Sequence, residues 1–265
     1  MPVYSHSKIS TFEQCPLKFK FRYVDKIIPE VEKTVEAVLG SSVHSTLEWI
    51  YKQVGNNIIP SIEEAIINYS EKWKEQFNDN VQITYKNLKE EDYFNKGVRF
   101  ILNYYMKHHP FDDNTIAIEE RINVTLDVNK EYTLIGYIDR LVYNLERDEF
   151  EIHDYKTGGS LPPQEKFDND RQLPLYSLAL KEKYGKDKKI CFVWHYLAFD
   201  KKICSSRTDE QLEQLRKDVL ELIKKIEQET EFKPCVSKLC DWCEYKSICP
   251  MWNYEIKYDK QMRLG

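Results

Sequence analysis

Apolar residues recur at intervals of three and four along much of the chain, a spacing that predicts amphipathic helices. In the stretch 40–55 this stripe consists of Val43, Leu47, Ile50 and Val54. Pro174 fits a helix only within its first turn, because an interior proline would break it. Apolar spacing, capping residues and prolines together predict helices at 7–15, 16–24, 40–55, 62–77, 88–106, 168–184 and 210–229.

Runs that alternate apolar and polar residues, or that are rich in aromatic and β-branched residues, predict strands. They occupy 115–127, 132–143, 150–155, 190–197 and 200–205. The polar insert 144–149 predicts that the second and third runs form an antiparallel hairpin. A turn centred near Glu146 would then place Asp139 opposite His153 or Asp154. Helices and strands in this mixture predict an α/β fold.

Length and composition predict a globular protein with a substantial core. The chain has 265 residues, of which 42% are hydrophobic and 13% aromatic, which suits one large domain or a domain with appendages. No run of about 18 apolar residues is present, and the N-terminus lacks the apolar region of a secretory signal. We therefore expect a cytoplasmic protein with no membrane partner.

The net charge of -5, from 44 acidic and 39 basic residues, argues against indiscriminate binding of polyanions. A local basic cluster nevertheless consists of Lys18, Lys20, Arg22 and Lys26, interleaved with aromatic residues. Such a mixture is compatible with phosphate contacts and base stacking. An amphipathic surface helix has the same pattern, so both interpretations stay open.

The predicted hairpin carries acids where a half-buried strand usually has apolar residues. Asp139 lies in its first strand, and Asp154 and Lys156 lie in its second. Residues two apart on a strand point to the same face, so Asp154 and Lys156 project together. Adjacent carboxylates are ligands that Mg²⁺ or Mn²⁺ prefers, and the lysine can orient a water molecule beside them. An exposed, salt-bridged hairpin is the alternative.

Further candidate residues lie on neighbouring predicted elements. His44 and Glu48 are four residues apart on one helix and can point into a shared pocket, although a packed or surface histidine is the alternative. One of Glu119 and Glu120 is expected on the face of the sheet that carries Asp139, but spacing alone does not choose between them.

The chain contains seven cysteines, four of them near its C-terminal end. Cys240-x2-Cys243-x5-Cys249 supplies three thiolates, which favour zinc or an iron-sulfur cluster. Either Cys235 or Cys15 can provide the fourth ligand: the first makes a local zinc-type site, and the second joins the two ends of the chain. Buried free thiols are the alternative for this group, and Cys191 and Cys204 are expected in the core.

Six motifs follow one another along nearly the whole chain. They are Ser7-x2-Ser10-x4-Cys15-Pro16-x2-Phe19, Gly40-x3-His44, Gly136-x2-Asp139-Arg140, Asp154-Tyr155-Lys156-Thr157-Gly158, Gln172-x3-Tyr176 and Cys240-x2-Cys243-x5-Cys249-Pro250. In this order they resemble the RecB-like branch of the PD-(D/E)XK nucleases. They also resemble its subset with a four-cysteine 4Fe-4S cluster, which includes the AddB nuclease domain and CRISPR-associated single-strand exonucleases.

The resemblance implies a restriction-endonuclease-like fold, with a central mixed β-sheet flanked by helices, a helical insertion and a C-terminal cysteine-rich segment. It implies a single domain over 1–265. Within it, 1–30 and 232–252 would be the cluster-binding ends, 56–110 the helical insertion and 115–206 the catalytic core.

The resemblance also implies a function and a set of site residues. His44, Asp139, Asp154 and the backbone carbonyl of Tyr155 would surround the catalytic Mg²⁺ or Mn²⁺, with Lys156 beside the attacking water. Gln172 and Tyr176 would contact the substrate strand or steady the site. Cys15 would complete a 4Fe-4S cluster with Cys240, Cys243 and Cys249, while Cys235 lies outside the family pattern and keeps the zinc alternative open.

The implied activity is that of a DNA exonuclease acting on single-stranded ends in repair, recombination or CRISPR adaptation. A helicase or a CRISPR adaptation protein would be its partner. A non-catalytic DNA-binding subunit with a structural zinc or iron-sulfur site is the alternative function.

Overall fold

A central mixed sheet is the core of the computed structural model, which describes residues 3–29, 31 and 33–252; the outer residues of the expected 1–265 domain lie outside these ranges. The strand order is β1-β5-β6-β7-β8, with β4 on the other side of β5. The β1–β5 and β6–β7 pairs are parallel and the other pairs antiparallel. The strands are β1 (Val3–Tyr4), β4 (Thr115–Thr125), β5 (Thr133–Asn144), β6 (Glu149–Lys156), β7 (Lys189–Tyr196) and β8 (Lys201–Ser205). The expected mixed α/β fold is confirmed.

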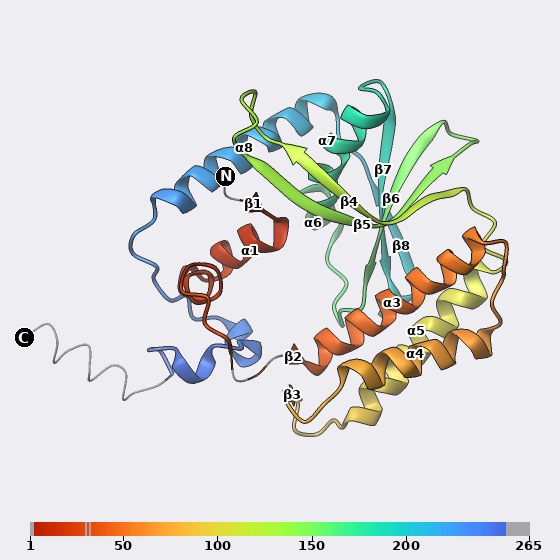
Figure 1. Ribbon diagram of the computed structural model, residues 1–265, viewed down its shortest axis with the longest axis horizontal. Helices are drawn as coiled ribbons and strands as arrows, with labels where there is room; N and C mark the ends of the chain where they lie inside the picture. The colour runs from red at the N-terminus through yellow and green to blue at the C-terminus, as the bar shows by residue number, and fades with distance from the viewer. Residues whose placement is uncertain (1–2, 30, 32, 253–265) are drawn as a thin grey trace, which may run out of the picture.

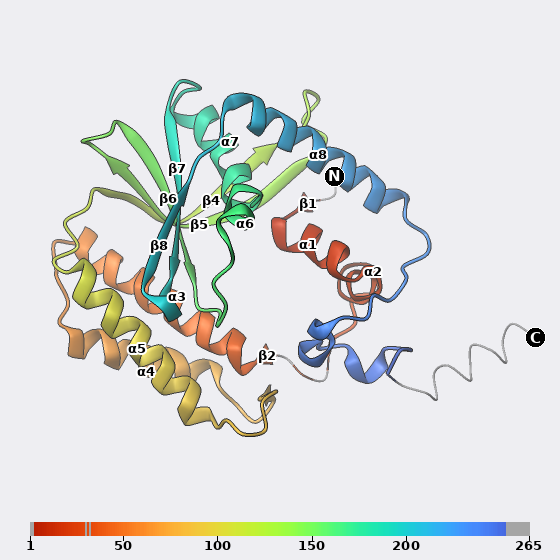
Figure 2. The ribbon, with the colours of Figure 1, turned by 180° about the vertical axis from the view of Figure 1, so that it is seen from behind.

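Helices cover both faces of this sheet (Figures 1 and 2). One layer contains α3 (Val35–Gly55), α4 (Ile62–Gln76) and α5 (Glu90–His108), with the short pair β2 (Lys33–Thr34) and β3 (Val81–Gln82). The other contains α6 (Gln164–Asp168), α7 (Gln172–Tyr184) and α8 (Asp209–Gln228). A short 3₁₀ turn, Leu197–Phe199, joins β7 to β8. Because each layer buries its apolar stripe against the sheet, the molecule has two buried apolar clusters, one per face.

The first helices of the chain and its last described segment, residues 232–252, lie side by side (Figures 1 and 2). The N-terminal end comprises α1 (His6–Gln14), α2 (Pro16–Phe19) and a π-helical turn (Lys20–Val24). The C-terminal end carries 3₁₀ turns at Lys238–Trp242 and Lys246–Ile248. Phe19 stacks on Phe232 with ring centroids 6.2 Å apart, and Tyr245 donates a hydrogen bond to the carbonyl of Ile27 at 3.0 Å.

The cations of the basic cluster near the N-terminus form ion pairs within the protein. Lys18 pairs with Glu244 at 2.7 Å, and Lys20 pairs with Asp25 at 2.6 Å. The aromatic residues between the cations pack inward, since Phe19 is buried in the core. The arrangement supports the surface-helix interpretation over phosphate binding at this position.

Several expected elements differ from those observed. The helix expected at 40–55 begins at Val35, capped by Thr34, whose side chain accepts the backbone N–H of Ala37. The helix expected at 168–184 begins at Gln172 as α7, after the separate short helix α6 has ended at Asp168, which puts Pro174 in the first turn of α7. Placing Cys204 in the core is wrong, because it lies exposed on strand β8. Among the described helices, none has the length and apolar character needed to cross a membrane.

Candidate active site

The candidate site lies beside a stretch of β5 that has no paired strand on one of its two edges. Strand β4 pairs with β5 along one edge, over 133–142. On the opposite edge, β1 pairs with Thr133 and Leu134, and the pairing with β6 runs from Arg140 to Asn144. Within the described ladders, residues 135–139 therefore have no strand partner on that edge. Arg140 pairs with His153, so Asp139 stands beside Asp154, as the hairpin pattern predicts.

His44 of α3 contacts Asp139 of β5 and Tyr155 of β6. Its Nδ1 lies 3.3 Å from Oδ2 of Asp139, and its Nε2 lies 2.7 Å from the carbonyl oxygen of Tyr155, to which it donates. The same Asp139 oxygen accepts the backbone N–H of Tyr155 at 3.0 Å. The imidazole of His44, the carboxylate of Asp139 and the carbonyl of Tyr155, all expected around a metal ion, are thus in direct contact. His44 and Tyr155 are 111 residues apart in the sequence.

The charge of His44 follows from these contacts. Burial by itself would lower the pKa of His44, but the hydrogen bond and charge of Asp139, with the charge of Asp154, raise it to about 9. The imidazole is therefore cationic at neutral pH. It neutralises carboxylates that would otherwise repel each other.

Lys156 and Asp154 form a buried ion pair beside these groups. Lys156 Nζ lies 2.6 Å from Oδ2 of Asp154. Gln172 at the start of α7 links both residues, because its Nε2 donates to Asp154 Oδ1 at 3.3 Å and its Oε1 accepts from Lys156 at 3.4 Å. Burial lowers the pKa of Lys156, but the carboxylate of Asp154 outweighs burial and raises it. Lys156 consequently remains an ammonium group that can donate hydrogen bonds.

Tyr176, one turn beyond Gln172 on α7, packs directly on the backbone of β5. A Cβ added to Gly136 would lie 2.3 Å from the Tyr176 ring, so any side chain at this position would displace it. The glycine thus permits α7 to approach β5 three residues before Asp139. This contact explains why the segment preceding Asp139 contains a glycine.

Glu119 is a third acid at the site. The register pairs Ile118 with Arg140 and Glu120 with Ile138, which sets Glu119 opposite Asp139. Its backbone has a positive φ of 48°. Burial, followed by the charges of Asp139 and Glu48, raises the pKa of Glu119 to about 7. The other acid, Glu120, instead pairs with Lys183 of α7.

A buried network supports the acidic strands from the α3 side. The Arg140 guanidinium donates to Tyr155 Oη at 3.0 Å, to Thr115 Oγ1 at 3.0 Å and to His153 Nδ1 at 2.8 Å. It also pairs with Asp113. Because Arg140 and Tyr155 adjoin Asp139 and Asp154 in sequence, this network fixes the backbone that carries the acids.

The chemical types of the groups around Asp139 and Asp154 suit a hard divalent cation. Carboxylates, a carbonyl and an imidazole are suitable ligands for Mg²⁺ or Mn²⁺, and like-charged carboxylates held together are stabilised by a cation. His44 now supplies that cation. Among the described residues, no group of three or more His, Cys, Asp and Glu side chains has the arrangement of a metal site.

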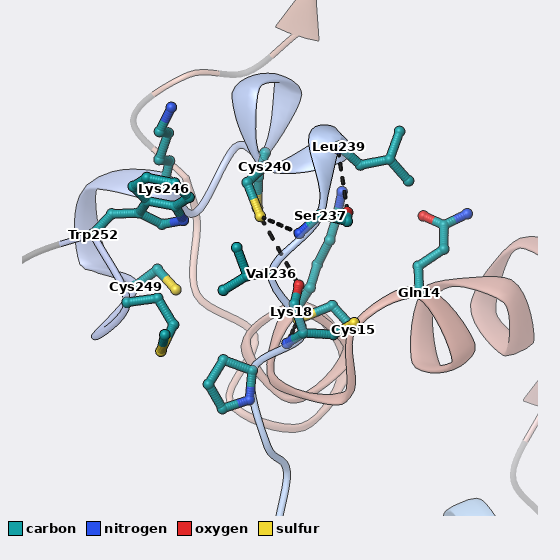
Figure 3. Close-up of a pocket in the computed structure, with 14 residues that line it drawn as sticks. Gln14, Cys15, Lys18, Val236, Ser237, Leu239, Cys240, Lys246, Cys249 and Trp252 are labelled. Atoms are coloured by element: carbon teal, nitrogen blue, oxygen red, sulfur yellow. Dashed lines mark hydrogen bonds between the residues drawn. The ribbon is translucent and has the colours of Figure 1, made fainter.

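The cysteines form a second candidate site at the contact between the chain ends (Figure 3). Cys15, Cys240, Cys243 and Cys249 line one hollow, together with Cys235. The sulfur of Cys15 accepts the backbone N–H of Cys235 at 3.4 Å. The sulfur of Cys240 accepts the backbone N–H of Ser237, also at 3.4 Å.

Amide hydrogen bonds of this kind suit sulfur atoms that carry negative charge, and hydrogen bonds to the sulfurs are one of the features that tune iron-sulfur clusters. The donor set of thiols fits zinc or such a cluster. Both expected fourth ligands, Cys15 and Cys235, border the hollow, so the arrangement keeps both alternatives.

Two neighbouring carboxylates and a lysine thus lie on a mixed sheet, beside a glutamine of α7. The sequence profile of the PD-(D/E)XK nuclease superfamily matches residues 3–250, and the chain belongs to that superfamily. No curated protein matches the chain.

Two solved structures resemble the fold. A protein from Eubacterium rectale named "Putative exonuclease" has 14% sequence identity and a TM-score of 0.52, over 89% of this chain and 86% of its own. The protein SSO0001 has 15% identity and a TM-score of 0.35, over 89% of this chain and 94% of its own. At 14% identity, the likeness to the first structure concerns the fold alone.

The residues predicted for the catalytic site lie near one another, and the predicted cysteines border one hollow, although no three cysteines of the described residues stand in the arrangement of a metal site. Glu119 and the network around Arg140 are additional. The alternating pattern of β4 left Glu119 and Glu120 equivalent, since the local backbone turn at Glu119 decides which one faces Asp139.

Proposed function

We propose that this nuclease is a divalent-metal-dependent DNA exonuclease that hydrolyses phosphodiester bonds at single-stranded ends. The observation that carries the proposal is the contact group of His44, Asp139 and the Tyr155 carbonyl beside the Asp154–Lys156 pair, at an open sheet edge. We propose that it processes DNA ends in repair, recombination or CRISPR adaptation, with a helicase or an adaptation protein as partner.

His44, Asp139, Asp154 and the Tyr155 carbonyl would hold the Mg²⁺ or Mn²⁺ ion. When bound, such an ion polarises the scissile phosphate and lowers the pKa of water. Metal binding requires a neutral imidazole, so His44 must lose its proton and its hydrogen bond to the Tyr155 carbonyl. In the metal-free protein, the protonated imidazole of His44 is the positive charge that balances the carboxylates.

Lys156 would act by position and charge. Since its pKa is raised, it is an ammonium group at neutral pH and is unsuited to act as a general base. It would donate hydrogen bonds to the nucleophile or to the phosphate, and would offset the negative charge that develops in the transition state. Gln172 would keep Lys156 and Asp154 in register through its two hydrogen bonds.

The test is digestion of end-labelled single-stranded and double-stranded DNA with Mg²⁺ or Mn²⁺, run beside Asp154→Ala and Lys156→Ala. We expect single-stranded ends to shorten progressively with the wild type. Lys156→Ala should lose cleavage and keep DNA binding. Equal activity of Lys156→Ala and wild type would refute its role, and absence of any metal-dependent degradation would favour the non-catalytic DNA-binding alternative.

We further propose that Cys15, Cys240, Cys243 and Cys249 hold a structural 4Fe-4S cluster that joins the two ends of the chain. The shared hollow and the amide hydrogen bonds to two of the sulfurs support this assignment. Anaerobically purified protein should be brown and contain iron and sulfide. A colourless protein with one equivalent of zinc would favour the alternative site with Cys235.

A further inference from the structure

A hollow of about 650 Å³ lies next to the candidate active site. It is bounded by β1, the start of α1 and residues 135–137 on the open edge of β5. Gln172 and Tyr176 also line it, and Gln172 contacts both Asp154 and Lys156. The hollow therefore adjoins the catalytic group through Gln172, and a volume of this size is typical of small-molecule sites.

Aromatic rings and one cation dominate the chemistry of this hollow. Tyr4, Tyr23 and Tyr137 contribute rings, and the Tyr137 side chain is the most open of them, with 53% of the residue exposed. Lys8 Nζ lies 4.4 Å from the centroid of the Tyr4 ring and 5.6 Å from that of Tyr23. The Tyr4 ring beneath Lys8 is buried, whereas Tyr137 is exposed in the same hollow. An exposed ring and a cation in one hollow are the combination that binds single-stranded nucleic acid by stacking and phosphate contact.

Lys8 is available for a ligand. Its ammonium group donates to the carbonyl of Val3 at 3.2 Å. Within the described part of the chain it forms no ion pair with a carboxylate, unlike Lys18 and Lys20 of the basic cluster. Burial lowers the pKa of Lys8, so an anionic ligand would stabilise a poorly solvated cation.

The spacing along β5 relates the hollow to the chemistry. Tyr137 precedes Asp139 by two residues, which separates their Cα atoms by about 7 Å along a strand. A nucleotide with its phosphate at Asp139 can therefore reach Tyr137 with its base. A base that enters the hollow beside the open edge of β5 must first leave a duplex, because a paired and stacked base cannot present its face to a ring in the hollow.

We infer that this hollow binds the nucleotide adjacent to the scissile phosphate, with its unpaired base stacked on Tyr137 and its phosphate beside Lys8. The inference rests on the proposed nuclease function and deepens it. It makes the hollow the feature that selects single-stranded DNA over duplex DNA.

The test compares Tyr137→Ala and Tyr137→Phe with Tyr85→Ala, a matched control because Tyr85 is 49% exposed and lies outside the hollow. Binding of a fluorescent oligothymidine is measured by anisotropy in the Lys156→Ala background, so that no cleavage occurs. We expect Tyr137→Ala to weaken binding by about 5- to 100-fold, the range for loss of one base–aromatic stack. Tyr137→Phe and Tyr85→Ala should bind as the parent does.

A second probe distinguishes stacking from a structural effect. Oligonucleotides with a single abasic site are scanned past the end, and at one position the penalty of Tyr137→Ala should disappear because no base remains to stack. Unchanged binding by Tyr137→Ala, or an equal loss for duplex and single-stranded DNA, would overturn the inference. Because these measurements need no cleavage, a protein that binds in this way but degrades no DNA would refute the proposed function and leave the binding site intact.

Discussion

The buried guanidinium of Arg140 offers the sharpest test of how the acidic strands are held. Arg140 is 1% exposed, and its carbon Cζ lies 4.1 Å from the centroid of the Tyr51 ring. Arg140→Met keeps the apolar length of the side chain and removes all of its hydrogen bonds. The variant leaves Asp113, Thr115 and His153 without the cation that joined them.

The magnitude follows from what each partner retains. Breaking a buried ion pair by removing one member costs about 3 to 5 kcal/mol. Tyr155 Oη keeps a contact with Tyr104 Oη at 3.2 Å, and His153 Nδ1 keeps one with His195 Nε2 at 2.8 Å. The Asp113 side chain is 33% exposed and can be rehydrated. We therefore expect the lower part of the range, about 3 to 4 kcal/mol, from a total stability of roughly 5 to 15 kcal/mol.

Urea unfolding followed by circular dichroism measures this loss in free energy of unfolding. A matched control is Arg147→Met, because the Arg147 side chain is 66% exposed and pairs with Glu149 on the surface. The control should stay within about 0.5 kcal/mol of wild type. Equal unfolding free energies for Arg140→Met and Arg147→Met would refute the view that the network holds the strands.

Three further predictions concern the site and the chain ends. Gly136→Ala should lower the free energy of unfolding by about 1 to 3 kcal/mol and reduce the cleavage rate, because the added Cβ would clash with the Tyr176 ring. Thermal unfolding and cleavage kinetics measure both effects. Gly158→Ala is the control, because a Cβ there meets nothing within 4 Å. Because the pKa of His44 is raised to about 9 from 6.5, its stabilisation of the metal-free protein should be complete below pH 6.5 and be lost as the pH rises through 9. Affinity for Mn²⁺ should rise over the same interval as the imidazole loses its proton, and a calorimetric titration with no pH dependence would contradict this assignment. Cys15→Ala should lower bound iron and loosen the N-terminal segment, as seen by limited proteolysis; full iron content in the variant would exclude Cys15 as a ligand.

Much of the fold was predictable because local spacing carries it. The helical stripe in α3 and the alternation in β4 reflect which side of each element meets the core. The antiparallel hairpin of β5 and β6 was predicted with Asp139 opposite His153 or Asp154, since a short polar insert between two strands leaves few registers. The structure selects Asp154, because Arg140 pairs with His153. The fold class and the superfamily followed from the order of the motifs.

Other features depended on residues that are distant in sequence. Residues 135–139 of β5 are unpaired on one edge because β1 and β6 pair with that edge on either side of them. The exposure of Cys204 depends on its position on β8 at the end of the strand order. Neither property is encoded in the composition of the strand concerned.

The sequence by itself determined which residues form helices and strands, and which acids, histidine and cysteines belong to recognisable motifs. Only the tertiary structure decided that Glu119, and not Glu120, joins Asp139, and that Arg140 is a buried cation. The physical reason is that burial and charge are set by neighbours from other elements. The same carboxylate is an ordinary surface group on an exposed strand and a strongly perturbed one beside other acids out of water.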